Sequence, residues 1–396
     1  MGALDALETL ADIALHKGSA TLSHPGYLAH MDPPSAPEAV AATLWMSSEN
    51  QNLLHPDVAP TARDLEQRVM DWMTPFFFPH HPNTSGGHMV PGSTVANLTA
   101  LWAAREIGGA NLTRVVASNR AHNSVRKACD LLRLEYVEVQ SCPRTHVLLP
   151  SSLVELGDLS NAALVLTAGT VATGAIDDLS ILTSDYSGTQ NKPLWTHIDA
   201  AWAGPLRLSP SLSPLLKGVE RADSIGFSAH KWLWQPKGSA LVLFKHVKEA
   251  HETMSYGGGY LATPTVGVLG TKKASALPLA ACLLSWGQKG VAARLEADVA
   301  RAAQLAELVE HDERFELWGV PTTGIVVWRP VDSCGCSVSE VRARLKGAWV
   351  SLTEIDGAMW FRSVATNPKA DPLLVFESVA AAFEECKLDV AKGDSH

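Results

Sequence analysis

The chain has 396 residues and a net charge of -9 at pH 7, with 46% hydrophobic and 18% charged residues. This length and composition suit two folded domains and exclude a disordered chain, while the acidic charge disfavours binding to nucleic acid or to an anionic membrane. No apolar run approaches the roughly 20 residues that a membrane span requires. We expect a protein that acts on small molecules, and the acidic N-terminal segment, unlike a signal peptide, indicates a cytoplasmic location.

Leucine and alanine side chains recur at helical spacing between Leu4 and Leu15, which predicts a short amphipathic helix that ends near Gly18. Residues 24–37 contain four prolines and are expected to be irregular. Two further helices are predicted over 36–45 and 62–73.

From residue 93 onward, helical stretches alternate with short apolar runs. The predicted helices cover 95–107 and 124–132, and the predicted strands cover 113–117, 136–139, 163–167, 195–199, 224–228 and 240–244. This alternation predicts an α/β fold with a mainly parallel sheet that is covered by helices on both faces. Ligands bind at the carboxyl ends of the strands in such sheets.

The C-terminal part of the chain predicts a smaller α+β domain. Two helices over 274–286 and 291–312, separated by Gly287 and Gly290, precede strands over 325–329 and 360–364. We therefore expect an N-terminal helical arm over 1–55, a large cofactor-binding domain over 56–290 and a small domain over 291–396.

Six cysteines are scattered along the chain without a C-x-x-C pair. Cys334 and Cys336 form a C-x-C, but no second Cys/His pair at metal-ligand spacing accompanies them. The pattern predicts neither a disulfide framework nor a metal site, and it is typical of a reduced protein.

The most informative segment is residues 228–232, which follow the predicted strand 224–228 and contain Lys231. A lysine by itself is most often a surface residue. Asp199 lies at the end of another predicted buried strand, and an ionised carboxylate there needs a cationic partner. The ring nitrogen of pyridoxal 5'-phosphate (PLP) would be that partner, with Lys231 bound to the cofactor as a Schiff base. The alternative for Asp199 is a helix cap or a satisfied core carboxylate.

Three neighbouring features complete this interpretation. Gly86 and Gly87, and then residues 91–94, lead into a predicted helix, so that Ser93 and Thr94 gather at a helix N-terminus, where phosphate binds. The same residues also form an ordinary N-cap. Ala201 is small enough to lie under the cofactor ring. His122, which follows the strand 113–117, is a candidate to stack on the ring, although a lone histidine is more often structural.

These segments, in this order, resemble the group II PLP-dependent amino-acid decarboxylases, the family of the aromatic-L-amino-acid, glutamate and diaminobutyrate enzymes. Residues 228–233 resemble the Schiff-base motif, 197–202 the motif that contacts the pyridine nitrogen, 92–98 the phosphate loop and 121–124 the stacking histidine. The resemblance runs from about residue 24 to residue 362. It implies PLP fold-type I, like aspartate aminotransferase, and a homodimer with active sites at the subunit interface.

The resemblance also implies roles for individual residues. Lys231, His122 and Asp199 would be catalytic. The residues that would hold the cofactor are Ser93, Thr94, His122, Thr170, Asp199, Ala201, Ser228, His230 and Lys231. Asn52 and the region around His24 would line the substrate side, and Arg362 is a candidate to bind the α-carboxylate through a bidentate fork, or else a surface arginine.

Three departures from the family pattern stand out. Val95 occupies a position where the family usually has Glu, and Val171 replaces the second threonine of a Gly-Thr-Thr element, so that Thr170 would have to substitute. The chain also begins only about 23 residues before His24, whereas family members commonly carry a longer extension that interlocks the dimer.

The resemblance implies the decarboxylation of an L-amino acid to an amine and CO2. A tyrosine on a mobile loop commonly donates the proton in this family, and the glycine-rich residues 254–260 offer Tyr260 first and Tyr256 second. Three alternatives stay open: oxygen-dependent decarboxylative deamination to an aldehyde, a carbon-carbon or carbon-sulfur lyase on the same fold, and a noncatalytic binding protein. The substrate also stays open. Four tryptophans would suit an apolar pocket but are more often core residues, namely Trp102, Trp202, Trp232 and Trp234.

Overall fold

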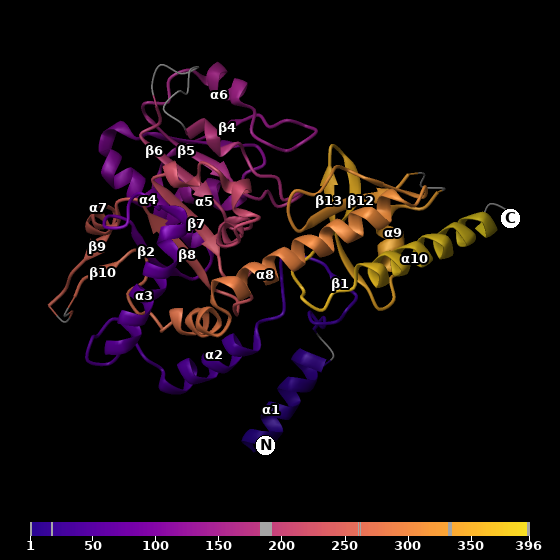
Figure 1. The fold of residues 1–396 in the computed structure, drawn as a ribbon, viewed down its shortest axis with the longest axis horizontal. Helices are drawn as coiled ribbons and strands as arrows, with labels where there is room; N and C mark the ends of the chain where they lie inside the picture. Colours follow the sequence, from indigo (N-terminus) through magenta and orange to yellow (C-terminus); the bar gives the residue numbers. More distant parts are fainter. Residues whose placement is uncertain are drawn as a thin grey trace.

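A seven-stranded sheet forms the centre of the larger part of the molecule (Figure 1). The computed structural model describes residues 2–16, 19–182, 192–259, 261, 263–331 and 335–393. The strand order is β2 (Gly86–Val90), β8 (Ala240–Phe244), β7 (Ser224–Ser228), β6 (Trp195–Asp199), β5 (Ala162–Thr167), β3 (Arg114–Ser118) and β4 (Glu135–Val139). The strands from β7 to β4 run parallel, whereas β8 and β2 pair with antiparallel neighbours. The predicted mainly parallel α/β sheet is confirmed.

The central strands are almost entirely buried because both faces of the sheet are covered. Every residue of β5, β7 and β8 is buried. Alternate side chains enter two separate cores: Leu164 and Leu166 pack on one face, and Ala163 and Val165 on the other. The helices around these cores are α3 (Pro60–Phe77), α4 (Ser93–Gly108), α5 (Asn123–Leu132), α6 (Pro150–Leu156) and α7 (Val247–Thr253).

A second sheet lies at the other end of the molecule. Its order is β1 (Tyr27–Leu28), β13 (Trp349–Ile355), β14 (Ala358–Val364), β12 (Ile325–Pro330) and β11 (Phe315–Leu317). Two helices, α9 (Val338–Ala343) and α10 (Pro372–Gly393), accompany it. Residues 24–37, expected to be irregular, contribute β1, which pairs in parallel with β13. The N-terminal segment is therefore attached to the smaller sheet.

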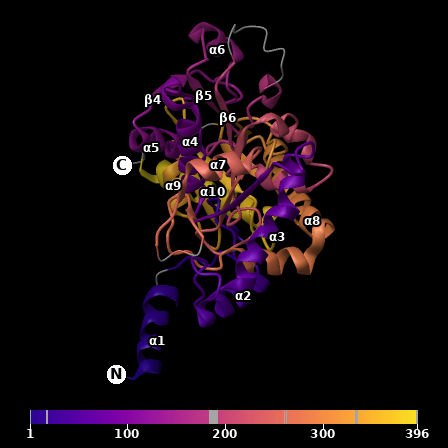
Figure 2. The same cartoon turned by 90° about the vertical axis from the view of Figure 1, so that its left-hand side faces the viewer.

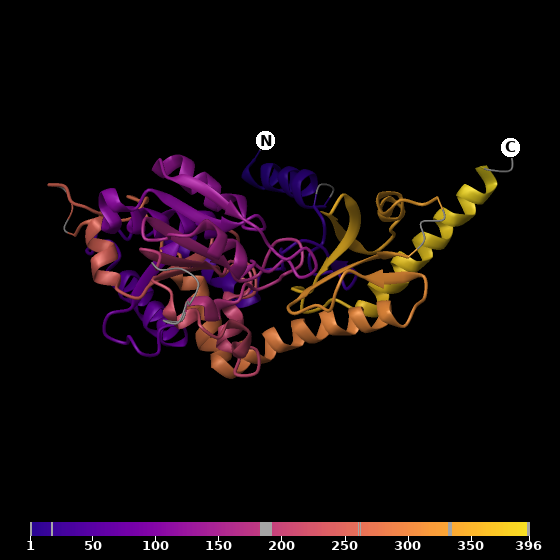
Figure 3. The same ribbon diagram turned by 90° about the horizontal axis from the view of Figure 1, so that it is seen from above.

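One long helix, α8 (Ala276–Glu310), connects the two parts (Figure 3). Gly287 has a non-helical backbone (φ 60°, ψ 178°), so the helix breaks there, as the sequence predicts. Gly290 stays helical, and the second half of the helix packs against the core of the smaller sheet through Ala302, Leu305 and Val309. The domain boundaries at residues 55/56 and 290/291 stay a prediction.

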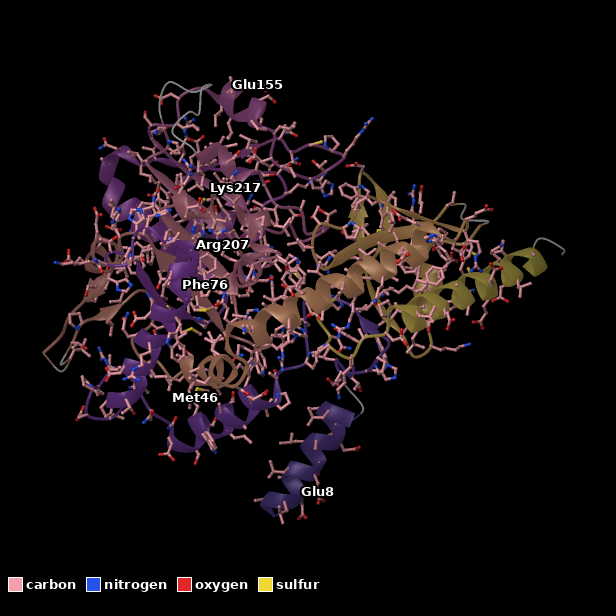
Figure 4. The ribbon with its side chains drawn as sticks, in the orientation of Figure 1. Glu8, Met46, Phe76, Glu155, Arg207 and Lys217 are labelled. Atoms are coloured by element: carbon pink, nitrogen blue, oxygen red, sulfur yellow. The ribbon has the colours of Figure 1, made fainter. Side chains whose placement is uncertain are left out.

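Two N-terminal helices lie at the edge of the molecule. The helix α1 (Ala3–Ala11), continued by the π-helical turn η1 (Asp12–His16), stands away from the body (Figure 2), and its Glu8 lies far from the other labelled side chains in Figure 4. The helix α2 (Pro37–Glu49) packs against α8, and its Met46 is buried. None of the helices in the described ranges combines the length and the apolar character needed to cross a membrane.

Several short elements escaped prediction. They include β9 (Ser255–Tyr256), β10 (Thr265–Val266) and the 3-10 helices Gly109–Asn111, Leu179–Leu182, Gly204–Leu208, Ser213–Leu216 and Val219–Arg221. The 3-10 helix Gly204–Leu208 is attached to the end of α3 by Arg207, whose Nε donates to the carbonyl oxygen of Phe76 at 2.8 Å. Both residues are labelled in Figure 4.

Gly86 and Gly87, which precede the predicted phosphate loop, belong to a strand. Both glycines lie in β2, where a Cβ on Gly87 would come within 2.1 Å of the carbonyl oxygen of Val242. They allow the edge strand to approach β8 and so serve packing.

Candidate active site

The candidate catalytic side chains meet at one edge of the large sheet. The parallel strands β5, β6 and β7 end at Thr167, Asp199 and Ser228, and Lys231 follows in the turn after β7. The N-terminus of α4 reaches the same edge, because the hydroxyls of Ser93 and Ser228 share a hydrogen bond of 2.6 Å. Segments far apart in the sequence are thus brought to the position where ligands bind in parallel sheets.

Lys231 has an amine that is unusually easy to deprotonate. Burial lowers the pKa of Lys231 from 10.5 to about 8, an effect that Asp199 opposes and that the positive charge of Arg362 increases. A lysine with this pKa holds a sizeable fraction of neutral, nucleophilic amine near neutral pH. The site therefore provides a nucleophile suited to a carbonyl group.

Asp199 is a buried carboxylate with spare acceptor capacity. It is 3% exposed, and its two oxygens accept from the side chain of Asn97 at 2.8 Å and from the backbone N–H of Ala201 at 3.1 Å. Within the described residues it makes no ion pair. Because a carboxylate has about four acceptor positions, a cationic N–H can still bind to it. The pyridine nitrogen of PLP fits this requirement.

The start of α4 and the loop after β7 form a polar lining. Gly92 has φ 102°, and a Cβ added there would lie 4.0 Å from Cε1 of His230. His230 donates from Nδ1 to the carbonyl oxygen of Ser239 at 2.8 Å, and burial lowers its pKa to about 4. The neutral ring therefore keeps Nε2 as an acceptor. Ser93 is half-buried and Thr94 exposed, and both stand at a helix N-terminus, where free N–H groups attract phosphate.

His122 is placed by its own helix. It is the N-cap of α5, and its Nδ1 accepts the backbone N–H of Ser124 at 3.2 Å and lies 2.7 Å from the hydroxyl of the same serine. Burial lowers the pKa of His122, while the charges of Asp199 and Lys231 act on it in opposite directions. A neutral imidazole therefore lies within electrostatic reach of both groups.

Arg362 reaches the site from the smaller sheet. It lies on β14 and is 6% exposed, and its Nε donates to the carbonyl oxygen of Val171 at 2.7 Å. Burial lowers the pKa of Arg362 to about 10, and the carboxylate that opposes this shift is Asp32. Within the described residues Arg362 has no ion-pair partner, although a buried guanidinium normally needs one. This arrangement suits the carboxylate of a ligand.

Other predicted residues have structural partners within the single chain. Asn52 accepts through Oδ1 from the backbone N–H groups of Leu54 at 3.1 Å and Lys272 at 3.3 Å. The ring of His24 packs edge-on against Trp349, with centroids 5.0 Å apart. Their substrate roles stay predictions.

Thr170 is buried, and its hydroxyl binds within its own turn. It accepts the backbone N–H of Ala175 at 3.1 Å and lies 3.0 Å from the hydroxyl of Thr173. Tyr260 lies outside the described residues, whereas Tyr256 is 57% exposed on β9.

Three of the four tryptophans are core residues rather than pocket walls. Trp202 and Trp232 are fully buried with ring centroids 4.1 Å apart, and Trp234 is 3% exposed. The fourth, Trp102, is partly buried and donates to Glu106 at 3.2 Å. The core interpretation is thus the better one for the first three.

Sequence reasoning missed Asn97 and His197, which are both fully buried. Asn97 stands one helical turn after Ser93 on α4, so the two side chains point to the same side of the helix. The signal available in the sequence was a polar residue four positions after Ser93 in a largely apolar helix. Its significance depends on Asp199, which is 102 residues away in the sequence.

Comparison with known proteins supports the assignment of the family. The model of the pyridoxal-dependent decarboxylase conserved domain matches residues 4–331. An L-2,4-diaminobutyrate decarboxylase of Rhizobium meliloti is 28% identical, with 92% of this chain and 79% of that protein aligned. A phenylacetaldehyde synthase of Petunia hybrida is also 28% identical, with 68% of this chain and 59% of that protein aligned.

The solved structures agree on the fold. A structure of the Oryza sativa TDC with PLP and tryptamine superimposes with a TM-score of 0.85 at 22% identity, covering 99% of this chain and 89% of that one. The expected PLP fold-type I is confirmed. The chain belongs to the pyridoxal-dependent decarboxylase family, as its motifs predicted, and is a PLP-dependent enzyme of the carboxy-lyase class.

Proposed function

We propose that the chain converts an L-amino acid into the corresponding amine and CO2, with Lys231, Asp199 and His122 as catalytic residues. The observation that carries the proposal is the position of Lys231, whose pKa is lowered to about 8, at the same sheet edge as the buried carboxylate of Asp199. Relatives that decarboxylate amino acids support the reaction type.

Each residue has a defined task in this proposal. Bound PLP supplies an electron sink for the pair of electrons that the departing CO2 leaves behind. Lys231 supplies the amine that binds the cofactor covalently, and Asp199 keeps the ring nitrogen protonated. His122 and Ala201 would contact the ring. The phosphate would be held by side chains around the N-terminus of α4, namely Ser93, Thr94, Ser228 and His230, and Thr170 would be a further cofactor contact.

A product analysis tests the proposal. Purified protein loaded with PLP is incubated with each amino acid, and CO2, amine, aldehyde and ammonia are quantified. We expect equal amounts of amine and CO2 from at least one L-amino acid. Retention of the carboxylate with loss of a side-chain fragment would show a lyase acting at Cβ instead.

Decarboxylative deamination is the second candidate, because a phenylacetaldehyde synthase is among the relatives. The two reactions differ in what happens after CO2 is lost: protonation gives the amine, whereas oxidation by O2 and hydrolysis by water give an aldehyde, ammonia and hydrogen peroxide. In the proposal a tyrosine of the loop after α7 donates the proton, Tyr260 first and Tyr256 second. Formation of one aldehyde per CO2 would establish the second candidate.

We expect Arg362 to bind the α-carboxylate of the substrate. Arg362→Leu should raise KM for the amino acid by about ten- to a hundredfold, because a charge-assisted bond contributes roughly 1.5–3 kcal/mol. Arg362→Lys keeps the charge but loses the two parallel N–H donors of the guanidinium, so its KM should lie between those of the wild type and Arg362→Leu. Steady-state kinetics measure the effect. An unchanged KM in Arg362→Leu would assign this arginine to structure alone.

The uptake of PLP should depend on pH through Lys231. The folded pKa of about 8 lies below the ordinary 10.5, so the amine is protonated below pH 8 and neutral above it. Only the neutral amine attacks the cofactor aldehyde. The initial uptake rate, followed by visible absorbance, should rise about tenfold per pH unit below 8 and level off above it. A flat profile between pH 6 and 8 would contradict the assignment.

We propose a homodimer as the functional unit. Apolar side chains of α1 and α2 face water in the single chain, including Leu4 at 75%, Leu7 at 63% and Trp45 at 68% exposure. A partner surface would cover them. Sedimentation should show a dimer, and Leu7→Asp combined with Trp45→Asp should shift it toward the monomer. A wild-type monomer at micromolar concentration would contradict this proposal.

A cytoplasmic location is also proposed. The cysteines in the described ranges are all free, and the thiols of Cys336 and Cys386 interact without forming a disulfide. Unlinked neighbouring thiols are typical of a reducing compartment.

A further inference from the structure

A chain of buried hydrogen bonds starts at the far end of β6 and reaches the cofactor site. Its side chains come from two strands, β6 and β7, and from the helices α4 and α5. Their order is Trp195, Ser224, His197, Asn97, Asp199 and, branching at Asn97, Ser124 and His122. Every link measures between 2.7 and 3.0 Å. We call this set the Trp195 chain. Trp195 and Asp199 stand at opposite ends of a five-residue strand, roughly 13 Å apart.

The first links begin at Trp195. An indole N–H can only donate, and it donates to Oγ of Ser224 at 2.8 Å. The same oxygen lies 2.9 Å from Nδ1 of His197, and a hydroxyl with two acceptor positions can donate or accept there. His197 is neutral, because burial lowers its pKa to about 4, and its Nε2 lies 3.0 Å from Oδ1 of Asn97.

Asp199 fixes the direction of the links. Its carboxylate can only accept, so the group that faces it at 2.8 Å must be the amide nitrogen of Asn97. The amide oxygen then faces Nε2 of His197, which must donate, and Nδ1 of the neutral ring accepts from the hydroxyl of Ser224. The second hydrogen of the amide nitrogen goes to Oγ of Ser124 at 2.9 Å, which leaves the serine hydrogen for Nδ1 of His122. The backbone N–H of Ser124 donates to the same Nδ1, which must therefore carry a lone pair.

We propose that Trp195, Ser224 and His197 are positioning residues for the cofactor site. They lock the amide of Asn97 in one orientation, so that Asp199 receives a hydrogen bond without receiving a proton, and His122 carries its only proton on Nε2. The inference concerns the cofactor pocket of this chain and does not depend on which amino acid is decarboxylated.

The fixed orientation of the Asn97 amide affects both Asp199 and His122. If the amide of Asn97 were reversed, its oxygen would face Asp199, and two acceptors at 2.8 Å would repel each other. The observed orientation favours the ionised carboxylate that a protonated ring nitrogen requires. It also leaves the Nε2–H of His122 outside the chain, available to a ligand.

Substitutions of His197 test the proposal through the affinity for PLP. His197→Leu removes the donor to Asn97, whereas the amide of His197→Gln can still donate. The control is His146→Leu. His146 is equally buried, and neither of its ring nitrogens has a hydrogen-bond partner within the described residues. We expect His197→Leu to weaken PLP binding about ten- to a hundredfold, His197→Gln less than threefold, and the control not at all.

The absorbance of bound PLP gives a readout that general destabilisation would not move. In His197→Leu, the pH at which the visible band of the bound cofactor titrates should shift by at least about one unit. A shift of one unit corresponds to 1.36 kcal/mol, which is the tenfold change expected for the affinity. Equal effects of His197→Leu and His146→Leu on both affinity and titration would overturn the proposal.

The wild-type protein decides the question even if a variant does not fold. Nitrogen-15 NMR of histidine-labelled, PLP-loaded full-length protein distinguishes the two neutral tautomers and the charged ring. We expect both His122 and His197 to be neutral at pH 7, with the proton on Nε2. A proton on Nδ1 of either ring, or a charged His197, would contradict the Trp195 chain.

Discussion

Replacing Lys231 by alanine is expected to lower the decarboxylation rate by at least about a thousandfold, which corresponds to roughly 4 kcal/mol of barrier. The variant loses the buried amine whose pKa, lowered by burial to about 8, suits it to attack the cofactor aldehyde. It should also fail to develop the visible absorbance band on addition of PLP. CO2 release and absorbance titration measure the two effects.

Lys237→Ala is the matched control for Lys231→Ala. Lys237 lies six residues further along the same loop, but its amine is paired with Asp32 at the surface. We expect the control to keep its activity within a few-fold and to bind PLP with the usual absorbance. If Lys231→Ala retained wild-type turnover, covalent catalysis through this residue would be excluded.

Substitution of Asp199 has the second largest expected effect. Asp199→Asn keeps the size of the side chain but removes the negative charge that holds the ring nitrogen protonated, and the electron sink weakens. We expect kcat to fall by about a hundred- to a thousandfold, or roughly 3–4 kcal/mol. The fall should exceed any change in KM, because the charge acts on the developing carbanion.

Asp298→Asn provides a control that is also a buried carboxylate. Asp298 is fully buried on α8, and its partner Arg301 comes from the next turn of the same helix. Burial raises its pKa to about 7, so its substitution tests the effect of removing a buried carboxyl elsewhere. We expect its kcat to stay close to that of the wild type. A similar loss of kcat in both variants would show that Asp199 contributes only to the folding of the core.

The sequence predicts the large sheet well where strands are buried on both faces. The bounds of β6, β7 and β8 agree with the predicted ones, because short runs built around large apolar residues and bounded by turn residues carry a strong signal. The strands β2 and β13 were missed. Gly86 and Gly87 disguise β2 as a loop, and the mixed polarity of β13 reflects a strand whose faces are only partly buried.

The sequence predicts those site residues that lie at or just after the ends of strands. Asp199 ends β6 and Lys231 follows β7, and such parallel neighbouring strands end at one edge of the sheet. Asn97 and His197 depend instead on side-chain hydrogen bonds between segments about 100 residues apart, which periodicity does not reveal. The position of Arg362 depends on how the smaller sheet sits against the loop at Val171.

The covalent attachment of PLP is the central claim and has a direct test. PLP-loaded wild-type protein is reduced with borohydride, digested and mapped by mass spectrometry. We predict one phosphopyridoxyl group per chain, located on Lys231. Attachment to another lysine, such as Lys237, or no attachment at all, would contradict the account.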